Sequence, residues 1–326
     1  MRPSMPVISA LYEPVATELG KVCAIFDDQL FSDLPVLNEL CSHVRRFRGK
    51  MLRPALLLLS GKACGGLTDE HLTLAAVVEL VHMATLVHDD VLDDADLRRR
   101  FPTVNRVEGN EAAVLLGDYL ISHAFHLCSA LDSQFASRRI GQTTNTVCEG
   151  ELQQVHHRGD LELTEEQYLQ IISRKTASMT ATCCLLGARY AGANVRTTAS
   201  LEQYGLHMGI AFQITDDVLD IVGSEESTGK TLGRDLDKHK LTLPVIHGLS
   251  AASPNECRHL RQLLSASQPD RPALRTALEA TGSIAYAMQA ARQYVESAVG
   301  FLDPLPPSES RDTLQRMANL ILEREQ

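Results

Sequence analysis

The sequence predicts an all-α protein that forms one domain over residues 1–326. Apolar residues recur mostly three and four positions apart, which is the period of helices with one buried face. Ala and Leu dominate these segments, and the strict alternation typical of half-buried strands is nearly absent. The expected helices cover residues 8–28, 33–45, 51–63, 69–93, 110–129, 134–149, 164–188, 196–222, 242–249, 254–265, 271–279, 282–302 and 308–324.

Turn-forming segments separate the expected helices. Each contains Gly or Pro among polar residues, and they lie at residues 61–70, 98–110, 156–164, 223–240 and 303–310. Acidic residues follow Thr68 and Thr164, and this pattern is typical of helix starts. Because no linker is long or biased enough to divide the chain, we expect a single domain.

Composition excludes several classes of function. The chain has 326 residues, 44% of them hydrophobic and 22% charged, as in an ordinary globular protein. The net charge of −10 argues against a nucleic-acid-binding protein. An early apolar run, at residues 55–59, is far shorter than the roughly 20 residues of a membrane span. We expect neither a signal peptide nor a membrane anchor, and a cytoplasmic location.

The cysteines indicate neither disulfides nor zinc. Eight cysteines scattered over this length do not form a disulfide framework. Cys183 and Cys184 lie in an apolar helical segment and are expected to be small buried residues.

A cluster of aspartates ends the helix expected at residues 69–93. In the stretch HDDVLDDAD, Asp89 and Asp93 lie four residues apart and share a helix face, with Asp90 beside them. Such acids repel one another and oppose the helix dipole. The preceding run is so apolar that this end is expected at the edge of the interior. Several carboxylates without a complete cage match Mg²⁺, which keeps water ligands and is often shared with substrate phosphates.

A second motif, FQITDDVLDIV at residues 212–222, has the same spacing. Asp216 and Asp220 lie four residues apart, with Asp217 beside them, again after an apolar run. One DDxxD motif alone is compatible with a solvated helix end. Two such motifs favour a small magnesium cluster that clamps a diphosphate between two helix ends.

Basic residues near these motifs are suited to bind phosphates. Each could be an ordinary surface charge, but together they offer arginine forks and lysine point charges. They are Lys50, Arg53, Arg98, Arg99, Lys175, Lys230 and Lys240. His82 lies seven residues before Asp89 and shares its face, so it is either a ligand or a buried core histidine.

In their order along the chain, the motifs resemble those of the trans-isoprenyl diphosphate synthases, or polyprenyl synthetases. They are GKMLRP, ELVHMATLVHDDVLDDADLRRR, GELQQ, RKT, FQITDDVLD, GKTLGRD and KLTLP, and the resemblance spans about residues 45–300. The family implies an all-α isoprenoid-synthase fold around a deep central cavity, usually in a homodimer. It also implies a prenyltransferase that condenses isopentenyl diphosphate with an allylic diphosphate primer, with Mg²⁺ as cofactor.

The resemblance assigns roles to the matching residues. The metal ligands would be Asp89, Asp90, Asp93, Asp216, Asp217 and Asp220. The allylic diphosphate would contact Arg98, Lys175, Lys230 and Lys240. The diphosphate of isopentenyl diphosphate would contact Lys50, Arg53, His82 and Arg99. Thr176 and Gln213 would lie near the carbocation that forms when the allylic C–O bond breaks.

The sequence departs from the family at three positions. Arg48, Arg100 and His239 stand where the family often has Gly. Each places a bulkier side chain near a phosphate-binding loop, and none replaces a matched ligand. The departures therefore bear on primer specificity and rate more than on the reaction class.

The residues before the first motif predict a long product. In the family, bulky residues four and five positions before the first aspartate stop chain growth early, whereas this chain has the small residues Thr85 and Ala84. The motif also looks most like that of the long-chain, octaprenyl-type members. Each helical turn adds about 5.4 Å of depth, which is roughly one isoprene unit. From the small residues and this likeness, we expect a product longer than C20, at about C40.

Three alternatives remain at this stage. Geranylgeranyl diphosphate (C20) is the main rival product. A class I terpene cyclase shares the helical fold and one DDxxD motif, but it lacks the site that Lys50, Arg53 and Arg99 would form. A regulatory synthase subunit would usually lack one or both acidic motifs, and this chain has both.

Overall fold

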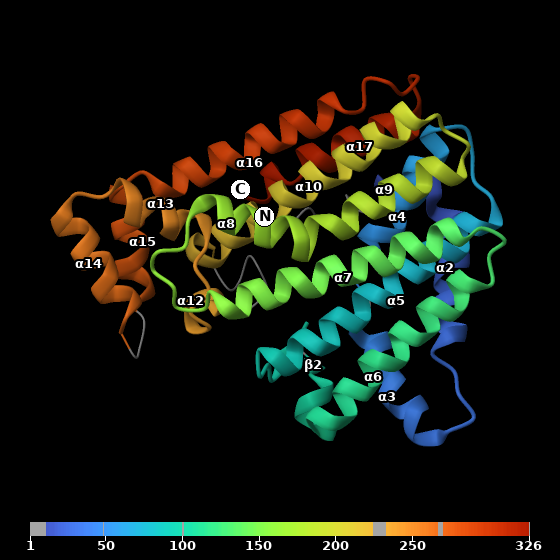
Figure 1. Cartoon of the computed structure of the whole chain (residues 1–326), viewed down its shortest axis with the longest axis horizontal. Coiled ribbons are helices and arrows are strands. Elements are labelled where there is room, and N and C mark those ends of the chain that lie inside the picture. The colour runs from blue at the N-terminus through green and yellow to red at the C-terminus, as the bar shows by residue number, and fades with distance from the viewer. Residues whose placement is uncertain (1–10, 48, 100, 224–232, 267–269, 326) are drawn as a thin grey trace.

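The computed structural model describes residues 11–47, 49–99, 101–223, 233–266 and 270–325, and most of these residues are helical (Figure 1). The predicted all-α class is confirmed. The first helices are η1 (Glu13–Val15), α2 (Ala16–Gln29), α3 (Pro35–Phe47), α4 (Leu52–Ala63), α5 (Asp69–Leu92), α6 (Val104–Ser129) and α7 (Gln134–His156). They are followed by α8 (Glu165–Ile172), the π-helical turn η2 (Ser173–Ala177), α9 (Ser178–Tyr190) and α10 (Val195–Val222). The last are α12 (Arg234–Asp237), α13 (Leu243–Ala251), α14 (Pro254–Leu264), α15 (Arg271–Ala280), α16 (Ser283–Gly300), α17 (Glu309–Asn319) and η3 (Leu322–Glu325).

One small hairpin interrupts the helices. The two-residue strands β1 (Leu97–Arg98) and β2 (Phe101–Pro102) pair in antiparallel fashion between α5 and α6. Within the described ranges they are the only strands.

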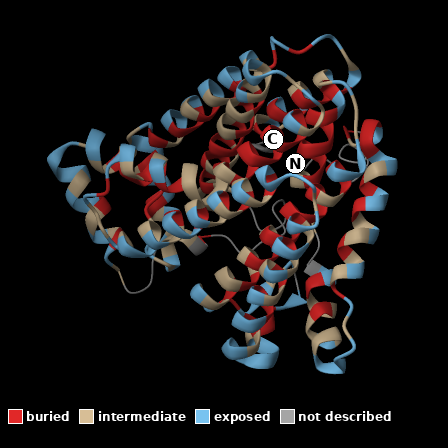
Figure 2. Ribbon diagram, turned by 45° about the vertical axis from the view of Figure 1, so that its right-hand side comes forward, coloured by how far each residue is buried: buried red, intermediate tan, exposed pale blue. Residues whose placement is uncertain are grey.

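The main core surrounds α5. This helix packs along α6 and also contacts α2, α4 and α9. Leu80 and Met83 on α5 have no exposed surface, and the same holds for Leu56 to Leu59 on α4. Buried segments gather in the middle of the molecule, as Figure 2 shows. By length and composition α5 could cross a membrane, but 72% of its most apolar window is buried among the other helices, as in the core helix of a globular protein. Its burial fixes the position of the aspartates at its end.

A second apolar cluster joins the C-terminal helices to α10. Leu243 on α13 and Leu278 on α15 are fully buried there, together with Ile214 on α10. The earlier part of α10 contributes Tyr204 and Met208 to the main core. Since α10 belongs to both clusters, its acidic end is held between them.

Two expected helix starts are confirmed in atomic detail. Thr164 and Gln167 form a capping box at the start of α8. At the start of α5, Thr68 forms the same arrangement with His71, whose buried ring also contacts the Gly187 carbonyl.

Several expected boundaries are wrong. The segment at 98–110 was expected to be a turn throughout, but α6 begins at Val104 and only kinks at Gly109, where φ is 87°. Burial of Val104 against the core favours the early start. The helix expected to end at residue 149 continues to His156. The first helix was expected from residue 8, but α2 begins at Ala16 after a 3₁₀ turn that contains Pro14; residues 8–10 lie outside the described residues.

Candidate active site

The first acidic motif lies at the C-terminal end of α5. Asp89 and Asp90 belong to its last turn, and Asp93 is its C-cap. Asp90 is almost fully buried and accepts two hydrogen bonds of 2.8 Å from Arg98, one from Nε and one from Nη2. Arg98 ends strand β1, a few residues beyond this helix end. The result is a fork-to-carboxylate pair, the strongest common geometry for such a contact.

Asp93 is held by two cations from distant parts of the chain. Arg158, in the turn after α7, donates from Nη2 to Oδ1 at 3.0 Å. Lys240, after α12, donates from Nζ to Oδ2 at 2.9 Å. Burial alone would raise the pKa of Asp93, but these two cations and Lys175 outweigh burial and hold the pKa below its usual value.

Lys175 lies on the π-helical turn η2, within the predicted helix at 164–188. Such turns are often found at functional sites. Its ammonium group donates to Gln154 Oε1 at 2.8 Å and pairs with Glu151 on α7. Burial alone would lower the pKa of Lys175, but the charges of Asp89 and Glu151 raise it, so the side chain stays cationic.

A chain of hydrogen bonds joins η2 to the second acidic motif. Thr176 Oγ1 donates to Gln213 Oε1 at 2.9 Å, and Gln213 Nε2 donates to Asp217 Oδ1 at 2.7 Å. Tyr168 on α8 donates its hydroxyl to the other Asp217 oxygen at 2.7 Å. Asp217 at the end of α10 is thus fixed in orientation, and the structure brings Thr176 and Gln213 together.

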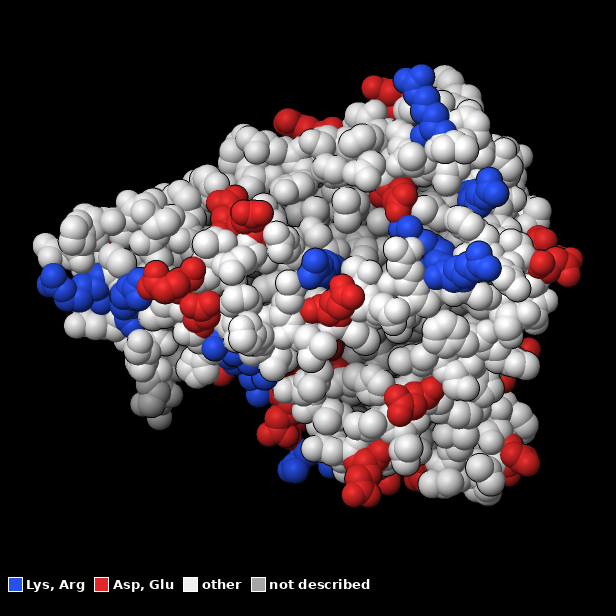
Figure 3. Space-filling view, in the orientation of Figure 1, with Lys and Arg blue, Asp and Glu red and all other residues white. Residues whose placement is uncertain are grey.

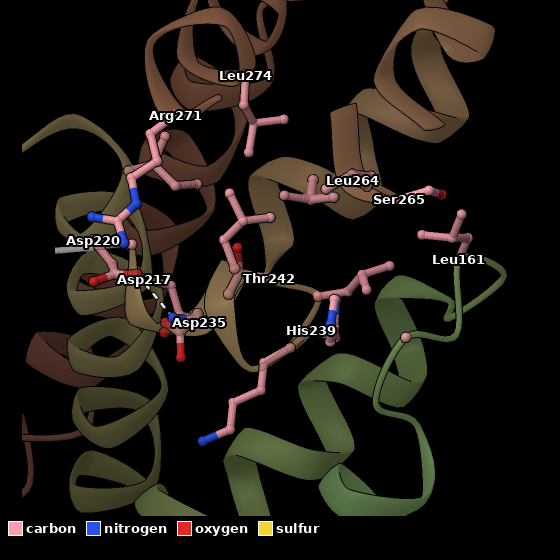
Figure 4. Close-up of a pocket in the computed structure, with 17 residues that line it drawn as sticks. Leu161, Asp217, Asp220, Asp235, His239, Thr242, Leu264, Ser265, Arg271 and Leu274 are labelled. Atoms are coloured by element: carbon pink, nitrogen blue, oxygen red, sulfur yellow. Dashed lines mark hydrogen bonds between the residues drawn. The ribbon is translucent and has the colours of Figure 1, made fainter. Parts of the chain in front are cut away.

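Asp217 and Asp220 of the second motif, together with Asp235 on α12, line a small pocket of about 170 Å³ (Figure 4). Asp217, Asp220 and Asp235 lie close together on one side, while Leu264 and Leu274 line the other. The Asp235 amide donates to Asp220 Oδ2 at 3.2 Å. Burial, and then the charge of Asp220, raise the pKa of Asp235 to about 7. Burial likewise raises the pKa of Asp217 well above its usual value.

Two lysines act on the first acidic motif and on Asp235, which lies beside the second motif. Lys240 hydrogen-bonds Asp93, and its charge also lowers the pKa of Asp235. Lys175 lowers the pKa of Asp89 at the first motif and of Asp235 beside the second. Because the Asp235 amide binds Asp220, Lys240 links the end of α5 to the segment that contacts the end of α10.

A second group of cations lies beside the first motif. Burial lowers the pKa of His82 well below its usual value, and the charges of Arg53 and Arg99 lower it further, so His82 is neutral. A Cβ atom at Gly49 would lie only 2.5 Å from Arg99 Nη2, so the segment that carries the exposed Lys50 also meets Arg99. Arg53 has a buried Nε without a hydrogen-bond partner. The four residues predicted for the second diphosphate are thus brought together.

Other predicted positions differ in their surroundings. Ala84 has no exposed surface, whereas Thr85 is partly exposed and donates its hydroxyl to the His82 carbonyl at 2.8 Å. Lys230 lies outside the described residues, as do Arg48 and Arg100. His239 is described, and its φ of 53° is left-handed, the conformation that favours the glycine common in the family.

Sequence reasoning missed five side chains that contact the predicted ones. Glu151 and Gln154 lie in GELQQ and Asp235 in GKTLGRD, so their motifs pointed to them although no role was assigned. Tyr168 carried no local signal, because its only distinction is the bond to Asp217. Arg158 lay in a segment interpreted as a turn.

The donor set fits divalent cations. The motifs offer only carboxylate oxygens, the ligands that Mg²⁺ prefers. Burial raises the pKa of Asp89 to about 6, which marks a carboxylate whose charge is incompletely compensated. Within the part of the chain that the structure describes, no three His, Cys, Asp or Glu side chains are already gathered as a metal site. Asp90 and Asp93 are instead paired with Arg98, Arg158 and Lys240.

Basic and acidic side chains are mixed on the face shown in Figure 3, where Lys and Arg are scattered among Asp and Glu.

Comparisons with known proteins agree with this site. Residues 34–281 match the polyprenyl synthetase family. The chain is 32% identical to octaprenyl diphosphate synthase from Escherichia coli, over 98% of this chain and 99% of that protein. It is 36% identical to a short chain isoprenyl diphosphate synthase from Methanothermobacter thermautotrophicus, over 89% of this chain and 90% of that protein.

A solved structure shares the whole fold. The polyprenyl synthase from Caulobacter crescentus, complexed with calcium and isoprenyl diphosphate, is 30% identical and covers 97% of each chain with a TM-score of 0.91. The two acidic helix ends, the cations around them and this agreement in sequence and fold lead to one conclusion. The chain belongs to the polyprenyl synthetase family and is a trans-prenyl diphosphate synthase.

Proposed function

We propose that this enzyme elongates an allylic diphosphate with isopentenyl diphosphate, in head-to-tail steps, to a long all-trans polyprenyl diphosphate near C40. The observation that carries the proposal is that Lys175 and Lys240 act both on Asp93 of the first motif and on Asp235, whose amide binds Asp220 of the second motif. A separate group formed by Arg53, His82 and Arg99 lies beside the first motif. One diphosphate fits between the acidic motifs, and a second fits the neighbouring arginines.

Metal binding is part of the proposal. Asp89, Asp90 and Asp93 would hold Mg²⁺ on one side, and Asp216, Asp217 and Asp220 on the other. When bound, the metal would neutralise the diphosphate and make it a better leaving group. The Caulobacter protein, with its calcium and isoprenyl diphosphate, supports a divalent cation here.

The side chains of this protein would assist the departure of the diphosphate. Lys175 and Lys240 would lie against its oxygens, where negative charge grows as the allylic C–O bond breaks. Arg98 would contribute its fork once metal relieves it of Asp90. Thr176 Oγ1 and Gln213 Oε1, held 2.9 Å apart, would present oxygen atoms to the developing allylic cation.

Orientation of the second substrate would come from the other cation group. Arg53, Arg99 and Lys50 would bind the diphosphate of isopentenyl diphosphate, and the neutral His82 would add a hydrogen bond. Its double bond would then attack the allylic cation, and the proton lost would pass to the departed pyrophosphate. Burial around α5 would exclude water, which would otherwise quench the cation.

Geranylgeranyl diphosphate is the second candidate product. One observation favours it: a relative named as a short-chain synthase is 36% identical. A homodimer and a cytoplasmic location complete the proposal, and light scattering of the purified protein tests the first of these.

The test is product analysis. Purified protein receives Mg²⁺, farnesyl diphosphate and labelled isopentenyl diphosphate, and the dephosphorylated products are sized. A ladder that ends near C40 supports the proposal, while a stop at C20 favours the second candidate. Pyrophosphate release without elongation would indicate a cyclase. Binding without any turnover would indicate a regulatory subunit.

A further inference from the structure

Two residues with a left-handed backbone conformation lie next to the two cations that bind the Asp93 carboxylate. Gly159 has a φ of 75° and His239 a φ of 53°, and the Gly159 amide donates to the His239 carbonyl at 2.8 Å. Arg158 precedes Gly159, and Lys240 follows His239. This single backbone hydrogen bond therefore aligns the two cations, which reach opposite oxygens of Asp93.

Arg158 is the less satisfied of the two cations. Its Nε is buried and lacks a hydrogen-bond partner, although its Nη2 contacts Asp93. A guanidinium has five N–H donors, and a buried donor without an acceptor costs free energy. The Arg158 side chain also remains 27% exposed, against 9% for Lys240. Because Asp93 carries one negative charge, Lys240 alone can balance it, and Arg158 is available for another anion.

We propose that Arg158 is a further diphosphate-binding residue, which holds Asp93 in the metal-free protein and turns to the allylic diphosphate when a divalent cation replaces it on Asp93. The inference rests on the proposed function, because it needs a metal-bound diphosphate at the acidic motifs. The arginine fork matches two phosphate oxygens at once, and the released Nε would gain the acceptor that it lacks. Its place in a turn, rather than within a helix, leaves the side chain free to reorient.

Binding of Mn²⁺ and inorganic pyrophosphate tests the proposal without turnover. Electron paramagnetic resonance would measure Mn²⁺ binding, and calorimetry would measure pyrophosphate binding in the presence of Mn²⁺. In Arg158→Met, we expect Mn²⁺ alone to bind at least as tightly as in the wild type, because a competitor for Asp93 is gone. Pyrophosphate should bind about tenfold more weakly, since a hydrogen-bonded charge contributes roughly 1.4 kcal/mol or more.

Kinetics supply a second readout. In Arg158→Met, the KM for the allylic diphosphate should rise about tenfold, while the KM for isopentenyl diphosphate stays unchanged. Arg158→Lys keeps the charge without the fork and should fall between Arg158→Met and the wild type. Arg106→Met is the matched control. It removes an exposed arginine whose Nε lies 3.2 Å from Oδ1 of Asp96, a residue of the same acidic stretch as Asp93.

Each outcome decides the matter. Pyrophosphate binding by Arg158→Met that equals the wild type would show that the contact with Asp93 is structural only. Weakened binding of both diphosphates, or weakened Mn²⁺ binding, would also overturn the proposal. If Arg158→Met fails to fold, Arg158→Lys carries the same comparison. Should the wild type elongate no primer yet bind pyrophosphate with Mn²⁺, the proposed function fails while the binding assay still tests Arg158.

Discussion

Asp89 differs from the other acids of the first motif because, among the described residues, no cation hydrogen-bonds it. Asp90 has Arg98, and Asp93 has Arg158 and Lys240. Burial raises the pKa of Asp89 to about 6, and the charge of Lys175 offsets only part of this effect. The residue is therefore costly to the metal-free protein and suited to a cation.

The pH dependence of stability follows from that pKa. Because the pKa of Asp89 is higher in the folded protein than its usual 3.8, its contribution to stability is complete below about pH 4 and is lost as the pH rises through about 6. We expect Asp89→Asn, in EDTA, to gain about 1–2 kcal/mol of unfolding free energy over the wild type between pH 4 and pH 7, since two pKa units are worth roughly 3 kcal/mol before screening. Urea denaturation at several pH values measures this difference.

The same experiment has a built-in contrast. When Mg²⁺ and pyrophosphate are added, the unfolding free energy of the wild type should rise, because the bound metal compensates the charge of Asp89. The unfolding free energy of Asp89→Asn should not rise in the same way. A difference between the two proteins that does not change with pH would contradict the assignment.

His239 illustrates backbone strain at a residue that departs from the family. A left-handed conformation costs a non-glycine residue about 1–2 kcal/mol. Replacing the residue with glycine removes this cost, but the greater freedom of glycine in the unfolded chain takes back about 0.5–1 kcal/mol. We therefore expect His239→Gly to stabilise the metal-free protein by about 0.5–1 kcal/mol, measured by thermal unfolding.

The neighbouring glycine provides the opposite change. Gly159 is also left-handed, and a Cβ atom there would touch nothing within 4 Å, so only the backbone would resist substitution. Gly159→Ala should destabilise the protein by about 1 kcal/mol. Equal effects of both substitutions would show that backbone conformation does not decide them.

At the scale of elements, the π-helical turn η2 depends on a close approach of α7. A Cβ atom at Gly150 would lie 2.6 Å from the Lys175 amide nitrogen, too close for a normal contact. Glu151 and Gln154, on the same stretch of α7, hold the Lys175 side chain. The lysine therefore reaches the site through a backbone contact that only glycine permits.

Gly150→Ala should separate these two elements. We expect a loss of about 1–3 kcal/mol in stability and a lower turnover, because the lysine is displaced from the acidic motifs. Gly141→Ala, on the same helix, is the control. Its Cβ atom would make an ordinary contact of 3.7 Å with Phe125, and it should stabilise the helix by about 0.5–1 kcal/mol. Similar losses in both variants, by thermal unfolding and product assay, would refute the role of this contact.

Helices could be predicted where their own residues determine them. Thr164 and Gln167 cap α8 locally, and the apolar run of α5 requires no other information. The end of α7 and the start of α6 could not be predicted, because packing against other elements extends them. The π-helical turn could not be predicted either, because the residues that contact it, among them Gly150, belong to another helix.

At the scale of the whole molecule, the site depends on contacts between distant residues. Lys240 and Asp93 are 147 positions apart, and Tyr168 meets Asp217 across 49 positions. Periodicity and spacing predicted the two acidic motifs and the helices that carry them. The family resemblance assigned Lys240 to the phosphate site, but neither approach identified Tyr168, whose role is set by the packing of α8 on α10.

Product length is also a property of the whole molecule, and the structure separates the two positions that were predicted to set it. Thr85 lies one turn before Asp89 on the same face of α5 and is partly exposed, whereas Ala84 is fully covered. A phenylalanine at Thr85 would fill space below the acidic motif. At Ala84 it would instead overpack the core.

Thr85→Phe should therefore shorten the main product by at least one isoprene unit, since one helical turn of about 5.4 Å is close to the length of that unit. Ala84→Phe should cost about 1–3 kcal/mol of stability and leave the product distribution of the folded enzyme unchanged. Sizing the products made from farnesyl diphosphate, alongside thermal unfolding, distinguishes these results. Shortening by Ala84→Phe but not by Thr85→Phe would place the growing chain on the other face of α5, among the helices that now cover Ala84.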